Sequence, residues 1–353
     1  MTDVAIIGAG IAGLMCAQQL SQAGYSVLVL EKSRGLGGRV ATRRLHGSCA
    51  DHGVCYLKPK GEFFKCFVDF LCQRHLLEIW TDTVYEFKPG FGLIVPNLPV
   101  PRYIAPNGMN AIAKFLGQGL EILLNQRVTS INRTPENKWR LILESSNEEI
   151  TAAAVVVAIP APQALMLLEP LGETVLHDTF LNRLRFVEFD SCLSVMAGYP
   201  MASQLLPTWK AITFIEDDDL AWIGLDSSKR PNPQQPIFVV QSSNAFAQNY
   251  DQTQDLQSAG EIMLQRAAET LVLPWFKTPD WIQVHRWRYA FPSRPWHETY
   301  LLAGDSLPLV CCGDWCGGNL VEGAMLSGLA AAEQINHNLR SLLLPKEIFL
   351  DIF

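Results

Sequence analysis

The chain has 353 residues, of which 48% are hydrophobic and 18% charged, and this composition is typical of a globular protein rather than a disordered or fibrous one. Its formal net charge of −7 would repel a phosphate backbone, so we expect no nucleic-acid partner. The nine cysteines are scattered and odd in number, which favours reduced thiols and a cytoplasmic location. Cys312 and Cys316 lack a second ligand pair at zinc spacing, so we expect no metal site.

The first segments of the chain predict a βαβ unit. An apolar run at 4–7 is followed by a stretch of helical character at 11–23, which Gly24 would end as a C-cap residue. A second run of β-branched character at 25–30 then ends at Glu31. Strand, glycine loop, helix and strand in this order predict that the two strands are parallel. The N-terminus lacks the basic region of a signal peptide.

The remaining segments alternate between helical and strand patterns. Helices are predicted at 63–75, 110–116, 257–271 and 324–339, a hairpin at 80–95, and strands at 126–133, 139–143, 153–159, 193–197, 221–225, 237–241 and 310–312. The apolar stretch 152–168 is broken by Pro160 and Pro162 and is too short to span a membrane. We therefore expect it to be a buried strand followed by a turn, and we expect no membrane span.

Nucleotide-type segments at both ends with a sheet-rich block between them predict an α/β fold with an α+β insertion. The expected architecture is a Rossmann-like nucleotide-binding domain that is discontinuous in sequence, with a sheet-rich substrate domain inserted into it. The expected ranges are 1–58, 101–160 and 297–353 for the nucleotide-binding domain, and 59–100 and 161–296 for the substrate domain.

The glycine loop after the first strand carries the nucleotide-binding signal. Gly8 permits the tight turn, Gly10 lets a pyrophosphate approach the backbone, and Gly13 lets the helix pack on the strand. The N-terminus of the helix offers N–H groups and the positive end of its dipole to phosphate. Glu31 stands where a carboxylate would bind ribose hydroxyls. A chance glycine turn is the alternative, and the loop alone leaves NAD and FAD open.

The segment 32–44 favours FAD. Gly37 and Gly38 again permit close backbone approach, and Arg39 supplies a fixed cation for the pyrophosphate. A basic surface loop is the alternative interpretation. The segment 34–44 contains four arginines within eleven residues of an acidic chain, which argues against that alternative.

These motifs together resemble the flavin-containing amine oxidase superfamily. The strings Gly-Gly-Arg-Val-Ala-Thr-Arg-Arg at 37–44 and Asp-His-Gly at 51–53 resemble its renalase branch, as do Ala-Ile-Pro-Ala-Pro-Gln-Ala at 158–164 and His-Arg-Trp-Arg-Tyr-Ala at 285–290. The resemblance covers most of the chain, and the block from about 165 to 280 carries few of its motifs.

The resemblance implies a set of FAD contacts. Asp314 would bind the ribityl or pyrophosphate region, the backbone of Val128 would bind the adenine, and Cys55 and Tyr56 would lie along the flavin. A helix beginning near Glu322 would point its N–H groups at the flavin and favour its reduced form. The expected cofactor-binding residues are Gly8, Gly10, Ile11, Ala12, Gly13, Glu31, Lys32, Gly38, Arg39, Cys55, Tyr56, Val128, Gly313, Asp314, Glu322, Gly323 and Ala324.

The Ser-Gly-Gly-Cys-Tyr segment to which covalent members of the superfamily attach flavin is missing, so we expect non-covalent FAD. A second GxGxxG in a βαβ context, which NADPH-dependent flavoproteins commonly have, is also missing. We therefore expect the substrate itself to be the electron donor. The candidates for the substrate face, where arginine and aromatic residues suit an anionic or aromatic molecule, are Arg102, Tyr103, His285, Trp287, Arg288 and Tyr289. No single catalytic residue stands out among them.

The renalase resemblance implies a small dihydronicotinamide-type substrate, an isomer of NAD(P)H, that is oxidised by hydride transfer to flavin N5 with O2 as the final acceptor. One alternative is an amine oxidase, but no lysine can be assigned to the position near N5 that such enzymes usually fill. Another is a lipid- or carotenoid-type desaturase, for which the apolar tail 342–353 is a weak hint. A flavin-binding protein without catalysis is the third.

Overall fold

The computed structural model describes residues 2–144, 149–172, 175–200, 206–304, 308–318 and 320–345, so most of the apolar tail 342–353 lies outside it. The chain divides into two compact units, which are described separately. Unit 1 contains residues 1–38, 112–189 and 291–353, and unit 2 contains residues 39–111 and 190–290. In the described part of the chain, none of the helices is both long and apolar enough to cross a bilayer.

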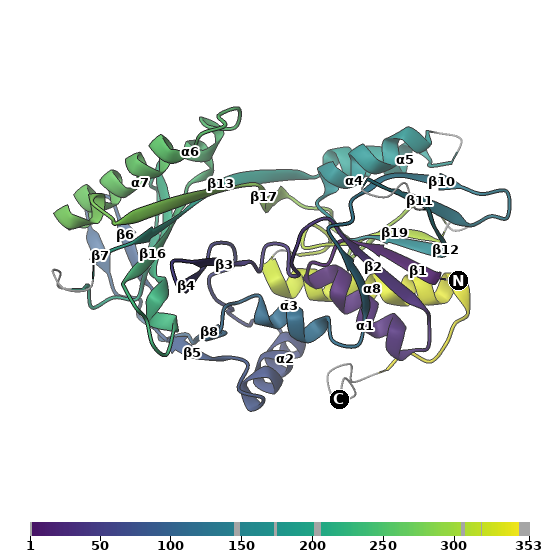
Figure 1. Ribbon diagram of the computed structural model, residues 1–353, viewed down its shortest axis with the longest axis horizontal. Coiled ribbons are helices and arrows are strands. Elements are labelled where there is room, and N and C mark those ends of the chain that lie inside the picture. The colour runs from purple at the N-terminus through teal and green to yellow at the C-terminus, as the bar shows by residue number, and fades with distance from the viewer. Residues whose placement is uncertain are drawn as a thin grey trace. The chain divides into compact units, whose positions relative to one another are not determined.

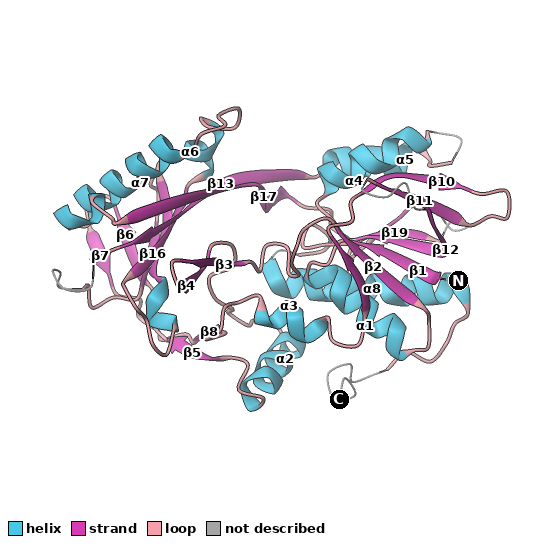
Figure 2. Cartoon of the chain, in the orientation of Figure 1, coloured by secondary structure: helices cyan, strands magenta, loops and turns pink. Residues whose placement is uncertain are grey.

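Unit 1 is built on a largely parallel sheet with helices on both faces (Figures 1 and 2). Its strands are β1 (Thr2–Ile7), β2 (Val27–Glu31), β9 (Glu121–Leu124), β10 (Val128–Arg133), β11 (Trp139–Leu143), β12 (Glu149–Val157), β18 (Leu301–Leu302) and β19 (Leu309–Cys311). Its helices are α1 (Ile11–Gln22), α4 (Ala161–Leu168), α5 (Asp178–Phe186) and α8 (Leu320–Leu339), with the 3₁₀ turn η1 (Glu169–Leu171); α3 (Ala111–Leu116) starts at its boundary.

The order β10-β11-β12-β1-β2-β9 places β1 at the centre, parallel to both β2 and β12, as the βαβ pattern predicts. Because side chains alternate along a strand, the two faces of β1 meet different layers. Ala5 and Ile7 pack in one cluster with α4 and α5, whereas α1 and α8 lie side by side on the sheet (Figure 1). A mixed α/β fold with a Rossmann-like unit is therefore confirmed.

The expected turn after β12 is wrong, because the chain forms helix α4 there. Pro160 is the N-cap of this helix and Pro162 lies in its first turn. A proline costs nothing at these positions, since the N–H that it lacks would have no partner inside the helix. Residues of α4 and α5 pack against the sheet of unit 1, so 161–189 belongs to the first unit rather than to the inserted block.

Unit 2 is built on a seven-stranded sheet of order β17-β13-β16-β15-β14-β6-β7 (Figure 2). Its strands are β3 (Thr42–Leu45), β4 (Ser48–Asp51), β5 (Glu78–Thr81), β6 (Tyr85–Lys88), β7 (Gly92–Ile94), β8 (Arg102–Ile104), β13 (Glu188–Gly198), β14 (Ala211–Phe214), β15 (Leu220–Leu225), β16 (Ile237–Ser242) and β17 (Trp281–Arg294). Its helices are α2 (Glu62–Gln73), α6 (Asn244–Gln248) and α7 (Gln257–Thr270), with 3₁₀ turns η2 (Asp226–Lys229) and η3 (Pro274–Lys277).

Helix α7 covers one face of this sheet and shares a core with it. Ile282 and Val284 of β17 meet α7 at Gly260, where an added Cβ would come within 2.5 Å of Val284. By alternation, the odd-numbered residues of β17 point to the opposite face, the side of the β3–β4 hairpin. The hairpin expected at 80–95 is shorter than predicted: β6 and β7 form it, and Trp80 belongs to β5, which pairs with β8.

Candidate functional site

The glycine loop of unit 1 has the geometry that a dinucleotide requires. A Cβ on Gly8, whose φ is +106°, would lie 2.6 Å from the carbonyl oxygen of Ala158, and one on Gly13 would lie 2.0 Å from that of Gly8. These two glycines are therefore required by the fold itself. The Cβ position of Gly10 differs, since no atom lies within 4 Å of it. Gly10 caps α1 and leaves open space at the positive end of the helix.

The second glycine pair folds back beside this loop. The N–H of Gly37 donates to the carbonyl oxygen of Ala9 at 2.8 Å, and Gly37 forms a parallel bridge with Gly10. Gly38 has a φ of +56°, and its Cβ position is 3.5 Å from the Cα of Gly10. The glycine motifs at 8–13 and 37–38 thus lie side by side, and none of the described side chains covers the backbone there. Ile11 and Ala12 of the first motif are the first residues of α1.

Glu31, at the end of β2, ties the two loops together. One carboxylate oxygen accepts the N–H of Ala9 and the other accepts the N–H of Ser33, both at 2.8 Å. These bonds fix the carboxylate and leave each oxygen a further lone pair for a ribose hydroxyl. Lys32 is exposed and its Nζ lies 3.5 Å from Oε1 of Gln163. Val128 begins β10 and is buried in the core of the unit.

The C-terminal segments of unit 1 reach the same region through helix packing. A Cβ on Gly328 of α8 would lie 2.2 Å from the carbonyl oxygen of Ala12, so α8 packs directly on the first turn of α1. A Cβ on Gly323 would likewise lie 2.8 Å from the carbonyl carbon of Gly318. Glu322 and Ala324 stand in the same first turn of α8.

The turn that precedes α8 is anchored to it. Gly313 follows β19 and donates its N–H to Oγ of Ser327 at 2.9 Å. Asp314 is only 5% exposed. The bare backbone at Gly10 and the N-terminus of α1 fit the pyrophosphate of FAD.

In unit 2, residues 51–57 form a stretch that we call the 51–57 segment. His52 is 4% exposed and stacks on Trp287 of β17, with ring centroids 5.3 Å apart and planes at 26°. The ring of His285 meets both of them edge-on, at 4.9 Å from His52 and 4.4 Å from Trp287. The indole N–H of Trp287 also donates to the carbonyl oxygen of His52 at 2.8 Å. Three flat rings thus form one cluster.

Both imidazoles in this cluster are neutral at physiological pH. Burial lowers the pKa of His52 to about 3, helped by His285 and by Arg43. Burial and Arg43 likewise lower the pKa of His285 to about 4. Nδ1 of His52 is buried and has no hydrogen-bond partner among the described residues.

The other end of the 51–57 segment meets β8. The guanidinium of Arg102 lies 5.4 Å from the ring centre of Tyr56. Tyr103 is on the opposite face of β8, where burial, Cys72 and Asp69 raise its pKa. The structure therefore separates Tyr103 from Arg102.

Strand alternation also separates the candidates on β17. Arg286 donates from Nη1 to the backbone carbonyls of Asp251 and Thr253, both at 3.0 Å, on the α7 side of the sheet. Arg288 shares that face and is exposed, whereas Tyr289 shares the face of His285 and Trp287.

Arg39 and Cys55 are held by backbone contacts in unit 2. Nη1 of Arg39 donates to the carbonyl oxygen of Ala290 at 3.0 Å. Cys55 is buried, and burial raises the pKa of its thiol well above the usual value. Nε2 of Gln241 on β16 donates to the carbonyl oxygen of Gly53 at 2.9 Å and lies 3.6 Å from the sulfur of Cys55. The 51–57 segment is therefore fixed against the sheet.

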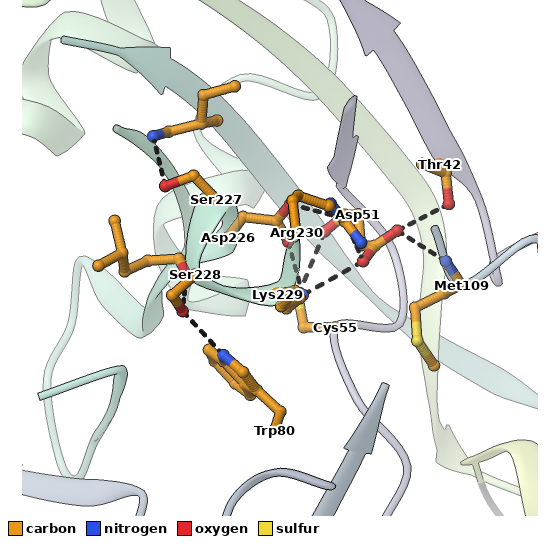
Figure 3. A network of polar contacts seen from close by, with 12 residues as sticks. Thr42, Asp51, Cys55, Trp80, Met109, Asp226, Ser227, Ser228, Lys229 and Arg230 are labelled. Carbon is orange, nitrogen blue, oxygen red and sulfur yellow. Dashed lines mark hydrogen bonds and ion pairs between the residues drawn. The ribbon is translucent and has the colours of Figure 1, made fainter. Parts of the chain in front are cut away.

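A buried ion network holds the start of this segment (Figure 3). Asp51 contacts Nζ of Lys229 at 3.3 Å and Nη2 of Arg230 at 2.7 Å, and Asp226 contacts the same two atoms at 2.5 and 2.8 Å. Asp51 also accepts the hydroxyl of Thr42 at 2.7 Å. Burial alone would raise the pKa of Asp51, but the two cations outweigh it and keep that pKa below its usual value.

Sequence reasoning missed most of this network. No pattern in the sequence gives a role to Lys229 or, outside the network, to Gln241 or Trp222, and Asp51 and His52 stand out only within a family motif. The spacing of Asp226, Lys229 and Arg230 at i, i+3 and i+4 is a signal of local ion pairing. Nothing in the sequence, however, indicates that Asp51 joins them from 175 positions away.

Comparison with known proteins yields two family matches. A model described as a flavin containing amine oxidoreductase matches residues 61–336, and one described as an NAD(P)-binding Rossmann-like domain matches residues 6–71. A flavin-containing monoamine oxidase of Mycobacterium tuberculosis is 44% identical over 57 residues, which are 16% of this chain and 13% of that protein. Putrescine oxidase of Kocuria rosea is 30% identical over 106 residues, 30% of this chain and 19% of that protein. The matched segments are thus short fractions of these relatives.

Solved structures resemble the chain over nearly its whole length. Putrescine oxidase bound to putrescine superposes with a TM-score of 0.71 at 14% identity, covering 95% of this chain and 99% of the other. Cyclohexylamine oxidase from Brevibacterium oxydans superposes with a TM-score of 0.69 at 16% identity, covering 96% and 99%. At this identity the similarity shows a common fold.

Proposed function

Because the chain belongs to the flavin containing amine oxidoreductase family, whose cofactor is FAD, we propose that it is a renalase-like oxidase of a small dihydronicotinamide-type substrate, with O2 as the final acceptor. FAD, when bound, supplies the acceptor for a hydride. The residues proposed to hold its phosphates and ribose are those of the glycine loops, Glu31 and Asp314. The sequence-based predictions for Tyr56, Cys55 and Arg39 remain proposals.

The observation that carries this proposal is the ring cluster of His52, His285 and Trp287. A dihydronicotinamide is a flat, uncharged ring that becomes a cation when it loses a hydride. The indole face of Trp287 attracts a cation more strongly than a neutral ring, so it would favour the oxidised form. Two neutral imidazoles do not repel that developing charge.

Amine oxidation is the second candidate, and Lys229 is the observation that favours it. Sequence patterns gave no lysine for the position near the flavin that amine oxidases use. Lys229 is the one buried lysine in the described part of the chain, and it is 2% exposed. It is, however, engaged by Asp51 and Asp226, and their charges raise its pKa against the effect of burial. A lysine held in this way supports the fold as readily as catalysis.

Anaerobic mixing of the purified flavoprotein with candidate donors separates the two functions. We expect isomeric dihydronicotinamides to bleach the flavin absorbance, and putrescine and benzylamine to leave it unchanged. Trp287→Ala should slow the bleaching at least tenfold, whereas Arg288→Ala, on the other face of β17, should slow it less than twofold. Bleaching by amines alone would establish amine oxidation instead, and an equal effect of the two variants would remove the ring cluster from the site.

A further inference from the structure

Two side chains near Tyr56 have hydrogen-bond donors to spare. The guanidinium of Arg102 is 5.4 Å from the ring centre of Tyr56, and the ring of Trp222 on β15 is 6.4 Å away, centre to centre. The backbone beside Tyr56 is fixed, because Leu57 and Tyr103 exchange N–H···O bonds of 2.8 and 3.0 Å. The backbone that carries Tyr56 and Arg102 is therefore fixed.

The spare donors are Nε of Arg102 and Nε1 of Trp222. Both atoms are buried and have no hydrogen-bond partner among the described residues, and Trp222 is only 6% exposed. The Arg102 side chain is already anchored, since its Nη1 donates to the carbonyl oxygen of Val100. Buried N–H groups nearly always have an acceptor in a native protein, because an unpaired one is costly. Two such groups beside one aromatic ring indicate that a ligand supplies the acceptor.

The surrounding charge shows which acceptor this is. Lys58 and Lys60 are exposed and follow Tyr56 directly in the chain. Partial burial lowers the pKa of Lys58, and so does repulsion by Arg102 and Lys60. The carboxylate of Asp69 acts on Tyr103, which lies on the other face of β8. Three cations gathered at one place attract an anion and repel a protonated amine.

We propose that Arg102, Tyr56 and Trp222 form a recognition site for an anionic oxygen group of the substrate, a carboxylate or a phosphate. Arg102 binds the anion, Trp222 donates a second hydrogen bond, and the Tyr56 ring supports the group next to it. This inference rests on the proposed function in that the anion belongs to the oxidised molecule. It adds that the substrate is acidic, and it disfavours simple alkyl amines.

Matched pairs of ligands test the site on the holoprotein by titration calorimetry, a readout that needs no turnover. Nicotinate and nicotinamide differ by a carboxylate, and nicotinamide mononucleotide and nicotinamide riboside differ by a phosphate. At least one charged member should bind about tenfold or more tightly than its neutral partner, since a hydrogen bond to a charged group contributes about 1.5–3 kcal/mol. The pair that shows the preference identifies the anion.

Arg102→Gln should abolish the preference, and Arg102→Lys should retain only part of it, because lysine has the charge without the Nε donor. The control is Lys88→Gln, which removes one exposed cation of unit 2 and should leave the preference intact. A preference that survives Arg102→Gln in a variant with full flavin content overturns the proposal, as does equal binding of both pairs by the wild type. An Arg102-dependent preference without any bleaching by dihydronicotinamides would refute the proposed function and leave the anion site standing.

Discussion

Gly10→Val separates binding of the cofactor from stability of the fold. The Cβ of the new side chain would meet no protein atom within 4 Å, and the backbone at Gly10 has φ −75° and ψ 177°, which any residue adopts. The apoprotein should therefore lose only about 1 kcal/mol of stability, the scale of an unfavourable N-cap residue. The side chain would instead fill the open space at the N-terminus of α1 that we assign to the pyrophosphate.

The expected loss of FAD affinity follows from the hydrogen bonds that the valine side chain would block. If the valine displaces two charge-assisted N–H···O bonds, each contributing about 1.5–3 kcal/mol, the free energy of binding falls by about 3–6 kcal/mol. That corresponds to a decrease in affinity of about 10² to 10⁴-fold. Flavin absorbance of the purified protein, together with a titration of the apoprotein with FAD, measures it.

Two other glycines serve as controls for this experiment. Gly35→Val changes an exposed residue of the same loop system that has equal space around its Cβ position, and it should keep its flavin. Gly13→Val places its Cβ 2.0 Å from the carbonyl oxygen of Gly8 and should prevent folding altogether. A Gly10→Val protein that is purified with full flavin occupancy would refute our assignment of the loop.

Lys229→Met should lower the free energy of unfolding by about 3–5 kcal/mol, because it leaves two buried aspartates with one cation; urea denaturation measures this, with Lys88→Met expected to change it by less than about 0.5 kcal/mol. The folded-state pKa of His52, about 3, lies below the unfolded value of about 6.5, so the unfolded state binds more protons between these values and stability should fall as the pH drops from about 6.5 towards 3. His52→Phe should flatten that slope by up to one proton, and an unchanged slope would show that His52 is not buried as a neutral ring. Trichloroacetic acid should release all the flavin into the supernatant, and a precipitate that stays yellow would contradict non-covalent binding.

The nucleotide unit could be predicted from the sequence because its signals are local. The turn at Gly8, the helix after Gly10 and the acidic end of β2 fall within thirty-one consecutive residues, and each follows from backbone sterics or hydrogen bonding. The turn predicted after β12, where the chain instead forms α4, also came from a local signal. Two prolines in a short stretch predict a turn, but the start of a helix accepts both Pro160 and Pro162.

The site in unit 2 could not be predicted in the same way, since its contacts join distant parts of the chain. His52 meets Trp287 and Gly53 meets Gln241 only because the 51–57 segment lies across a sheet made from much later residues. The patterns at 285–289 indicated aromatic and basic candidates without telling which face of β17 each would occupy. Pairing with β13 and packing on α7 decide that, and both are tertiary effects.

The alternation along β17 has a consequence for how this protein can change. Even-numbered positions such as Ile282 and Val284 are constrained by α7, while the side chains of His285, Trp287 and Tyr289 point to the opposite face of the sheet. Substitutions at the odd positions can therefore alter what is recognised without disturbing the core, and a mutant library confined to them should consist largely of folded proteins. Deletion of one residue of β17 before position 285 would disturb the core. It would turn the odd-numbered side chains towards α7 and the even-numbered ones towards the opposite face of the sheet.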